Sequence, residues 1–323
     1  MSLLVIGSVA FDDLATPSGT RSNILGGSAS YFSLSASHFK PVEVVAVVGQ
    51  DFGPEHFKVF QDRPIGLEGL VQVPGQSFRW RGRYGQDLNE AETLDTQLNV
   101  FATFQPVLPE KSRTAPFLFL GNIDPVLQLN VVNQMARRPR WVALDTMNFW
   151  IEGAREALLA VLKTTDILLV NEAEARSLSG ERNLVQAYRK ICDLGPRILV
   201  VKRGEHGVSL FTPDGCFMAP AFPLEHVQDP TGAGDTFAGG FLGYLASADA
   251  LDLQSLKRAT LAGTVMASFT VEAFGTARLE TVTPTCIQER LRLFTDMIHV
   301  SHPSSNPSPW SLLHEHGQAP LHL

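Results

Sequence analysis

The sequence predicts an α/β fold in which a doubly wound, mostly parallel sheet is flanked by helices. Short apolar segments recur along the chain, and continuous rather than alternating apolar runs are typical of strands buried on both faces. Most are followed by segments with helical spacing, and this alternation favours right-handed crossovers between parallel strands. The predicted strands span 3–9, 42–48, 117–120, 142–144, 167–170 and 198–201, and the predicted helices include 28–39, 154–162, 171–179, 253–270 and 285–298.

Composition narrows the class of protein. With 323 residues, 44% of them hydrophobic and 18% charged, the chain has ample material for a core. A net charge of −7 without a basic run argues against nucleic acid as a main partner. No apolar run approaches the roughly 18 residues of a membrane span. The three widely spaced cysteines fit a reducing compartment, so we expect a cytoplasmic protein.

One region departs from the strand–helix alternation. From Phe78 to Tyr84, aromatic residues occupy one parity and arginines the other, and positions 94, 96, 98 and 100 continue in the same style. Period-two alternation is typical of half-exposed strands. We therefore predict a small β-lid, inserted at about 69–104, which could also serve as a homodimer interface. An ordinary edge hairpin without function is the open alternative.

The composition changes abruptly near the C-terminus. From residue 301 the chain is rich in Pro and holds four of the nine His, in no spacing that matches a known metal-ligand set. We therefore predict a main domain over 1–298 and a disordered tail over 299–323.

The most informative stretch runs from Asp229 to Phe241. Gly232 and Gly234, with only Ala233 between them, allow backbone N–H groups to turn inward and form an anion-binding nest. A predicted helix from Asp235 to Leu245 follows, and its N-terminus favours a phosphate or a developing oxyanion. Asp235 is thus positioned to accept a proton beside a phosphoryl group. An N-cap role is the alternative, but a cap does not need the glycines before it.

This stretch resembles the C-terminal signature of the ribokinase-like (phosphofructokinase B-type) carbohydrate kinase family. Gly26-Gly27 resembles the substrate-side motif of that family, and Val48 to Gly53 is similar to its Val-Gly-x-Asp-x-Phe-Gly pattern, one residue shorter. Asn171 and Glu174 match its metal-linked Asn-x-x-Glu element. The likeness covers about residues 1–298 and implies a ribokinase-like fold.

The resemblance implies transfer of the γ-phosphoryl group of ATP to a hydroxyl of a sugar, nucleoside or related polyol, with Mg²⁺ as cofactor. Asp235 would be the base, and the backbone N–H groups from Gly232 to Asp235, including those of Ala233 and Gly234, would form the anion hole. Asn171 and Glu174 would organise Mg²⁺ through water. A capping box explains this pair equally well, and a need for a monovalent cation is left open.

Two further groups of residues follow from the resemblance. Lys202, Gly204 and Gly207, after the strand at 198–201, would hold the nucleotide, unless they form a plain hairpin turn. Asp12 would bind acceptor hydroxyls together with Gly26 and Gly27, although neighbouring Asp13 is an alternative.

Two departures from the family pattern leave the acceptor open. Tyr31 stands where many relatives have Asn, which changes the hydroxyl pattern that the pocket can recognise. The stretch from Asp145 to Trp150 resembles a family Asp-x-Asn element but ends in two aromatic residues, which could line the substrate or simply pack. Pentose, hexose, nucleoside and inositol acceptors therefore remain candidates.

Two other functions compete with that of a kinase. A catalytically silent sugar- or nucleotide-binding regulator could share the fold, but it would be free to lose Asp235 and the Gly-Ala-Gly turn. A nicotinamide-dependent oxidoreductase would need Gly-x-Gly-x-x-Gly after the first strand, and the segment from Gly7 to Asp12 does not supply it.

Overall fold

The computed structural model describes residues 2–89 and 91–299. Apart from residue 299, the predicted tail lies outside the described residues. The strands are β1 (Leu3–Ile6), β2 (Ala10–Thr16), β3 (Gly19–Gly26), β4 (Val42–Val48), β5 (Ile65–Gln72), β6 (Phe78–Tyr84), β7 (Ala91–Gln97), β8 (Phe117–Leu120), β9 (Trp141–Asp145), β10 (Ile167–Asn171), β11 (Ile198–Lys202), β12 (Val208–Thr212) and β13 (Gly215–Ala219). The helices are α1 (Ser28–Ala36), α2 (Pro54–Gln61), α3 (Pro125–Gln134), α4 (Asn148–Gly153), α5 (Arg155–Leu162), α6 (Glu172–Ser179), α7 (Leu184–Cys192), α8 (Ala233–Ala248), α9 (Leu253–Thr270), α10 (Ala277–Thr281) and α11 (Pro284–Ile298).

The larger sheet confirms the predicted fold class. Within the described residues it has nine strands in the order β13-β12-β11-β10-β9-β8-β1-β4-β5. The strands from β11 to β5 are parallel, whereas β12 and β13 are antiparallel and close one edge. The central strands β1, β8 and β9 are buried along their whole length, which explains their continuous apolar sequence.

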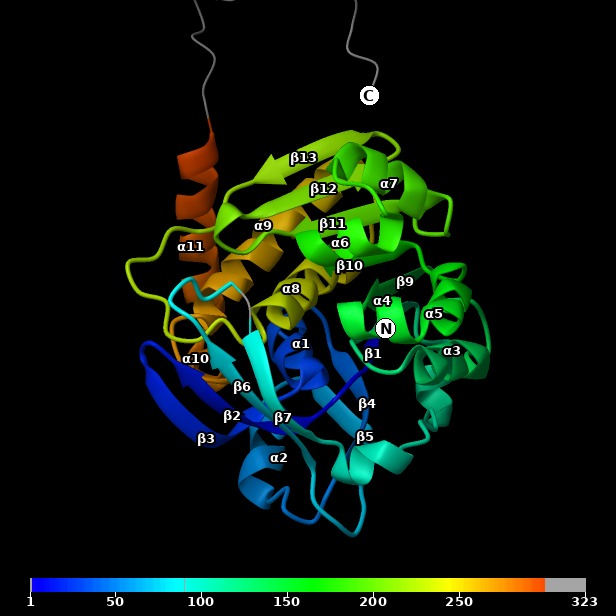
Figure 1. The fold of residues 1–323 in the computed structure, drawn as a ribbon, viewed down its shortest axis with the longest axis vertical. Coiled ribbons are helices and arrows are strands. Elements are labelled where there is room, and N and C mark those ends of the chain that lie inside the picture. Colours follow the sequence, from blue (N-terminus) through cyan, green and yellow to red (C-terminus); the bar gives the residue numbers. More distant parts are fainter. Residues whose placement is uncertain (1, 90, 300–323) are drawn as a thin grey trace, which may run out of the picture.

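Helices cover both faces of this sheet and create two apolar cores (Figure 1). One core packs α1, α2, α8, α9 and α11 against alternate strand residues such as Val5 and Val44. The other packs α3, α5, α6 and α7 against the intervening residues, such as Ile6 and Val45. Among residues 2–89 and 91–299, no helix combines the length and the apolar content that a bilayer crossing requires.

The parallel register brings polar side chains to one edge of the sheet. Asp145, Asn171 and Lys202 are the last residues of β9, β10 and β11, and Asn171 pairs directly with Lys202. The strand order reverses at β1, which lies between β4 and β8. In open α/β sheets, ligands bind outside the carboxyl ends of the strands, so this edge is where a site is expected.

A second, smaller sheet lies beside the main domain, but its predicted bounds were wrong. Its strands are in the order β3-β2-β6-β7, so half of it comes from residues 10–26, and β5 belongs to the larger sheet. Leu98 and Val100 fall at a 3₁₀ turn (Asn99–Thr103) rather than in a strand. The missed half includes β2, whose apolar start reads in sequence as a continuation of β1. Asp12 therefore lies on the smaller sheet.

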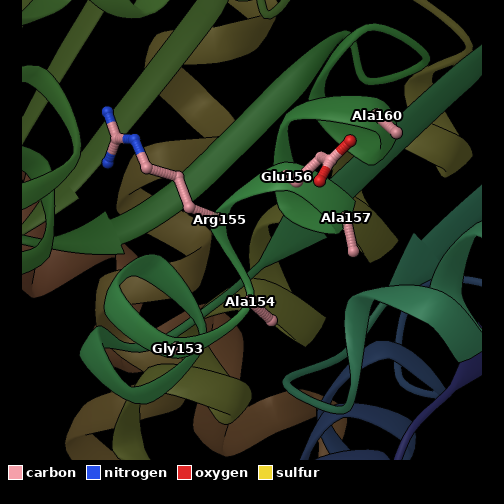
Figure 2. A pocket seen from close by; sticks show the side chains of 6 residues that line it. All are labelled: Gly153, Ala154, Arg155, Glu156, Ala157 and Ala160. Carbon is pink, nitrogen blue, oxygen red and sulfur yellow. The ribbon is translucent and has the colours of Figure 1, made fainter.

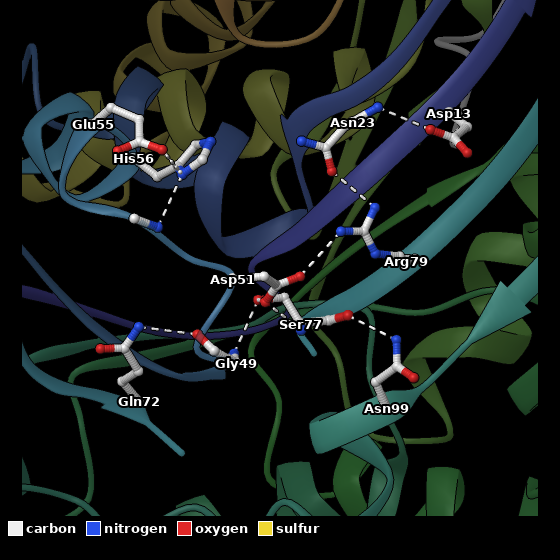
Figure 3. Close-up of polar contacts among 11 residues, drawn as sticks. Asp13, Asn23, Gly49, Asp51, Glu55, His56, Gln72, Ser77, Arg79 and Asn99 are labelled. Carbon is white, nitrogen blue, oxygen red and sulfur yellow. Dashed lines mark hydrogen bonds and ion pairs between the residues drawn. The ribbon is translucent and has the colours of Figure 1, made fainter. Parts of the chain in front are cut away.

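A polar cluster attaches the smaller sheet to the loop after β4 (Figure 3). Asp51 accepts hydrogen bonds from the Ser77 N–H at 2.8 Å and the Ser77 hydroxyl at 2.7 Å, and it forms an ion pair with Arg79 at 3.0 Å. Arg79 also donates to Asn23 Oδ1 at 2.8 Å. The segment from Val48 to Gly53 thus contacts β6 directly, and through Arg79 it reaches β3.

Candidate active site

The turn before α8 has the predicted shape, but the helix begins earlier than predicted. Gly232 is left-handed with φ 73° and is the N-cap, so α8 starts at Ala233. A side chain at Gly232 would also overlap the ring of Tyr31. Asp235 is the third residue of the helix, and the alternative in which it caps the helix is wrong.

The N–H groups of this turn are only partly available to an anion. The Ala233 N–H donates to the Pro230 carbonyl at 3.2 Å, so its inclusion in the anion hole is corrected. The Thr236 N–H donates to the Gly232 carbonyl at 2.8 Å and starts the helical ladder. The N–H groups of Gly234 and Asp235 precede that bond and lie at the positive end of the helix dipole. These two N–H groups are suited to hold a phosphoryl oxygen.

Asp235 is half-buried, and one oxygen of its carboxyl group is fully enclosed. Its Oδ1 atom has no hydrogen-bond partner among the described residues. Burial, reinforced by the negative charge of Asp145, raises the pKa of Asp235 to about 7. A carboxylate with a pKa near neutrality is a stronger base than ordinary Asp, and such a shift is typical of groups that move protons in catalysis.

Lys202 brings positive charge to the same place. Its Nζ lies 3.3 Å from Asp145 Oδ1, and a Cβ atom at Gly234 would stand 3.0 Å from that Nζ. Burial alone would lower the pKa of Lys202, but the carboxylates of Asp145, Glu174 and Asp235 outweigh it and raise the pKa. Lys202 therefore stays charged beside the Gly234 turn.

Asn171 and Glu174 form a complete capping box. Asn171 Oδ1 accepts from the Glu174 N–H at 2.8 Å, and Glu174 Oε2 accepts from the Asn171 N–H at 2.7 Å. Burial raises the pKa of Glu174 to about 7, and Lys202 opposes that rise. No cluster of three or more His, Cys, Asp or Glu in the described ranges is arranged to hold a metal directly. The pair thus has a structural role, and Glu174 Oε1 and the side-chain nitrogen of Asn171 lie outside the capping box.

The structure separates the two adjacent acidic residues of β2. Asp12 is buried and occupies the space that a side chain at Gly26 would fill. Asp13 instead accepts the Asn23 N–H at 2.8 Å and pairs with Arg81 at 3.2 Å. Burial, together with the charges of Asp229 and Asp235, raises the pKa of Asp12 to about 8. Asp12 therefore faces the site, and Asp13 stabilises the smaller sheet.

Gly27 is required for a different reason from Gly26. It has φ 92°, and a Cβ atom there would approach the backbone of Ser8 within 2.9 Å or less. Only glycine allows the start of α1 to pack this closely against the backbone between β1 and β2.

A cleft of about 640 Å³ lies beside Lys202 and Gly234. Gly204 and Gly207 also line it, in a 3₁₀ turn (Gly204–His206) between the antiparallel strands β11 and β12. The turn is thus both a hairpin connection and a cleft wall. Sequence reasoning missed several contributors to the wall. Among them are the tip of the β6–β7 hairpin (Asp87, Leu88 and Asn89), the segment 221–224 and the face of α9 that carries Thr264 and Ser268.

A second hollow, of about 450 Å³, is shown in Figure 2. It lies at the junction of α4 and α5 and is lined by Gly153, Ala154, Arg155, Glu156, Ala157 and Ala160. None of the predicted site residues lines it. Apart from Arg155 and Glu156, the lining residues are glycine and alanine, and we assign no chemistry to this hollow.

Comparison with known proteins agrees with the fold and with the predicted family. Residues 129–282 match the model of the pfkB family carbohydrate kinases. A cytidine kinase from Thermococcus kodakarensis is 30% identical over 250 residues, which cover 75% of this chain and 87% of that protein. A nucleoside kinase from Methanothermobacter thermautotrophicus is 27% identical over 307 residues, covering 85% of this chain and 90% of that protein. The aminoimidazole riboside kinase of Salmonella enterica, solved with aminoimidazole riboside and an ATP analogue, superposes with a TM-score of 0.72 at 21% identity, over 90% of this chain and 100% of that one.

The fold and these relatives together define the class of protein, an ATP-dependent phosphotransferase with an alcohol group as acceptor. The chain belongs to the pfkB family of carbohydrate kinases.

Proposed function

We propose that this kinase phosphorylates a hydroxyl of a nucleoside, with Asp235 as the base. The observation that carries the proposal is the unpartnered Asp235 Oδ1 beside the Gly234 turn and Lys202. A nucleoside acceptor is supported by two relatives that each match three quarters or more of the chain, one named a cytidine kinase and the other a nucleoside kinase.

Each residue has one task in this proposal. The acceptor hydroxyl gives its proton to Asp235 as its oxygen bonds to the γ-phosphorus, and the leaving ADP takes the electrons of the broken P–O bond. The N–H groups of Gly234 and Asp235 stabilise the equatorial oxygens, and Lys202 neutralises part of their charge. Asp12 accepts a hydrogen bond from an acceptor hydroxyl. Gly204 and Gly207 let the backbone approach ATP in the cleft.

The charges at this edge of the sheet suit Mg²⁺. Three carboxyl groups act on the ammonium group of Lys202, namely those of Asp145, Glu174 and Asp235. Coulombic repulsion from Asp145 adds to burial in raising the pKa values of Glu174 and Asp235. Mg²⁺ keeps several of its waters and needs few protein ligands. Glu174, through water, together with Asn171 as predicted, would hold the ion, and the ion would neutralise phosphate charge.

The test is an ADP-release screen of the full chain with Mg²⁺ and ATP. The acceptors are cytidine, uridine, adenosine, guanosine, inosine, ribose, fructose and myo-inositol. We expect at least one nucleoside to stimulate turnover clearly above the background ATPase. Turnover with a sugar alone would replace the nucleoside proposal, and no stimulation by any acceptor would favour the catalytically silent alternative.

The remaining expectations belong to the same proposal. A kinase domain over 1–298 and a cytoplasmic location are supported by the continuity of the fold and by three cysteines that form no disulfide. A homodimer through the smaller sheet is supported by Leu94 on edge strand β7, which is 46% exposed. Light scattering at high concentration tests the dimer, and a strict monomer would contradict it.

A further inference from the structure

Tyr31 lies between two segments of the site, the Gly26-Gly27 motif and the Gly232 turn. It lies in the first turn of α1, where its N–H donates to the Gly27 carbonyl at 3.2 Å. Its ring lies against Gly232, where a side chain would overlap it. Tyr31 is only 1% exposed, so the whole side chain is enclosed between the Gly26-Gly27 motif and the Gly232 turn.

The hydroxyl group of Tyr31 has no hydrogen-bond partner among the described residues. Two other tyrosines of the chain contrast with it, since the Tyr84 hydroxyl bonds with the Thr231 hydroxyl at 3.2 Å and the Tyr188 hydroxyl donates to the Arg197 carbonyl at 3.1 Å. Burying an unpartnered hydroxyl costs free energy, and buried Tyr usually finds a partner. Phe would fill the same space without this cost, so the hydroxyl at Tyr31 points to a partner that the protein itself does not provide.

The groups around Tyr31 are mostly acidic. Burial, followed by the charges of Asp12 and Asp229, raises the pKa of Tyr31 well above its usual range, so the phenol remains a neutral donor. Asp229 is already occupied, because it accepts the N–H groups of Thr231 and Gly275 at 2.9 Å each. Asp12 and Asp235 are therefore the carboxyl groups left to accept hydrogen bonds from an acceptor, and the charges of both act on Tyr31.

We propose that Tyr31 Oη donates a hydrogen bond to a hydroxyl oxygen of the acceptor and thereby selects a riboside over a deoxyriboside. This inference rests on the proposed nucleoside kinase activity. A ribose hydroxyl that donates its proton to Asp12 still has lone pairs, and Tyr31 Oη supplies the matching donor. A deoxy acceptor lacks that oxygen and leaves both Tyr31 and Asp12 unpaired in a buried site, which is how polar sites reject such analogues.

The closed position of the smaller sheet strengthens this selection. The bond between Tyr84, at the end of β6, and Thr231 joins the smaller sheet to the loop before α8. Asp12, Tyr31 and Asp235 Oδ1 are all shielded from bulk water in this position. Hydrogen bonds to an acceptor are thus made in a dry site, where they discriminate more strongly.

The experiment compares Tyr31→Phe with the wild type and with Tyr188→Phe, a matched control far from the site in sequence. Turnover is measured with the best riboside of the acceptor screen and with its 2′-deoxy and 3′-deoxy analogues. In Tyr31→Phe, kcat/KM for the riboside should fall about tenfold, which is the loss expected for one hydrogen bond. The preference for the riboside over one of the two analogues should fall toward one, while KM for ATP stays unchanged.

Thermal unfolding separates this role from a structural one. Because the hydroxyl has no partner in the part of the chain that the structure describes, Tyr31→Phe should melt at or above the wild-type temperature. Tyr188→Phe should instead keep the riboside preference and melt slightly lower. An unchanged riboside preference in an active Tyr31→Phe, or a clearly lower melting temperature, would overturn the inference. A wild type without any nucleoside-dependent turnover would instead overturn the proposed function.

Discussion

Lys202 Nζ lies 3.3 Å from Asp145 Oδ1, so this ion pair reaches from β11 to β9 across the intervening strand β10. The two side chains are only 19% and 8% exposed. The pair holds the ammonium group against the Gly234 turn, where it can meet a transferring phosphoryl group. This ion pair therefore both links β9 to β11 and places the Lys202 ammonium group in the site.

Replacing Lys202 with Met should destabilise the protein and abolish most of its activity. Removing one partner of a buried ion pair leaves an uncompensated charge, and such losses are about 3–5 kcal/mol in the free energy of unfolding. Here the remaining charge would be that of Asp145. Chemical denaturation of the full chain measures this change.

The double variant Lys202→Met, Asp145→Asn is the control for that prediction. It removes both charges and should recover a large part of the lost stability, although not the activity. If the double variant is as unstable as the single one, the ion pair does not explain the effect of Lys202.

Asp235→Asn should lose activity and keep its fold. Asn preserves the shape of the side chain but cannot accept the proton, and the loss of a general base typically lowers the rate about 10²–10⁴-fold. The variant should unfold at or above the wild-type temperature, because the buried Oδ1 has no partner within residues 2–89 and 91–299 and Asp145 repels it. ATP binding should persist.

Asp249→Asn, at the other end of α8, is the matched control for Asp235. Asp249 is the C-cap of this helix and pairs on the surface with Arg140. It should show wild-type turnover. Near-normal turnover in Asp235→Asn would remove Asp235 from the catalytic step.

Stability in the absence of ligands should fall as the pH rises from about 4 to about 8. Burial raises the pKa of Asp12 to about 8 and the pKa values of Asp235 and Glu174 to about 7, all above their unfolded values. A raised carboxyl pKa contributes stability that is complete below the unfolded pKa and is lost as the pH passes the folded pKa. Melting temperatures at pH 5, 6, 7 and 8 should therefore decrease, and Asp12→Asn should show a shallower decrease. An equal slope in both proteins would mean that Asp12 does not titrate in this range.

The main sheet and the Gly-Ala-Gly turn could be predicted because their signals are local. Continuous apolar runs indicate strands that are buried on both faces of the sheet. The glycines before α8 indicate a turn whose residue 232 has a left-handed conformation. The smaller sheet could be predicted only in part. β2 pairs with β6 across more than 60 residues of chain, and its apolar start looks like an extension of β1. No local pattern encodes such a pairing.

Residue types alone could not predict the electrostatics of the site. An ordinary Asp has a pKa near 3.9, which makes Asp235 a weak base on sequence grounds. Only the fold places Asp145 and Lys202 close to it. The choice between Asp12 and Asp13 depends in the same way on which residue the strand turns toward Gly26.

The last prediction concerns the contact that positions the smaller sheet. Asp51, in the loop after β4, binds Ser77 and Arg79 at the start of β6, as Figure 3 shows. Burial tends to raise the pKa of Asp51, but the hydrogen bonds from Ser77 and Arg79 outweigh it and lower the pKa. The Asp51 carboxylate is therefore ionised, and both of its oxygens accept hydrogen bonds. The sheet that it holds carries Asp12 and Tyr84, so a displaced sheet would misplace the acceptor but not ATP.

Asp51→Asn should thus impair turnover of the acceptor more than binding of the nucleotide. Asn lacks the charge that attracts Arg79, and losing charge-assisted hydrogen bonds costs about 1.5–3 kcal/mol. Small displacements at a reacting centre cost up to about 10² in rate, so kcat/KM for the acceptor should fall about tenfold or more, while KM for ATP stays within about twofold. Glu92→Gln, which breaks the exposed Arg83–Glu92 pair of the same sheet, is the control and should change neither, because exposed pairs contribute little. If both variants behave alike, or if Asp51→Asn weakens ATP and acceptor equally, the contact does not position the sheet for the acceptor.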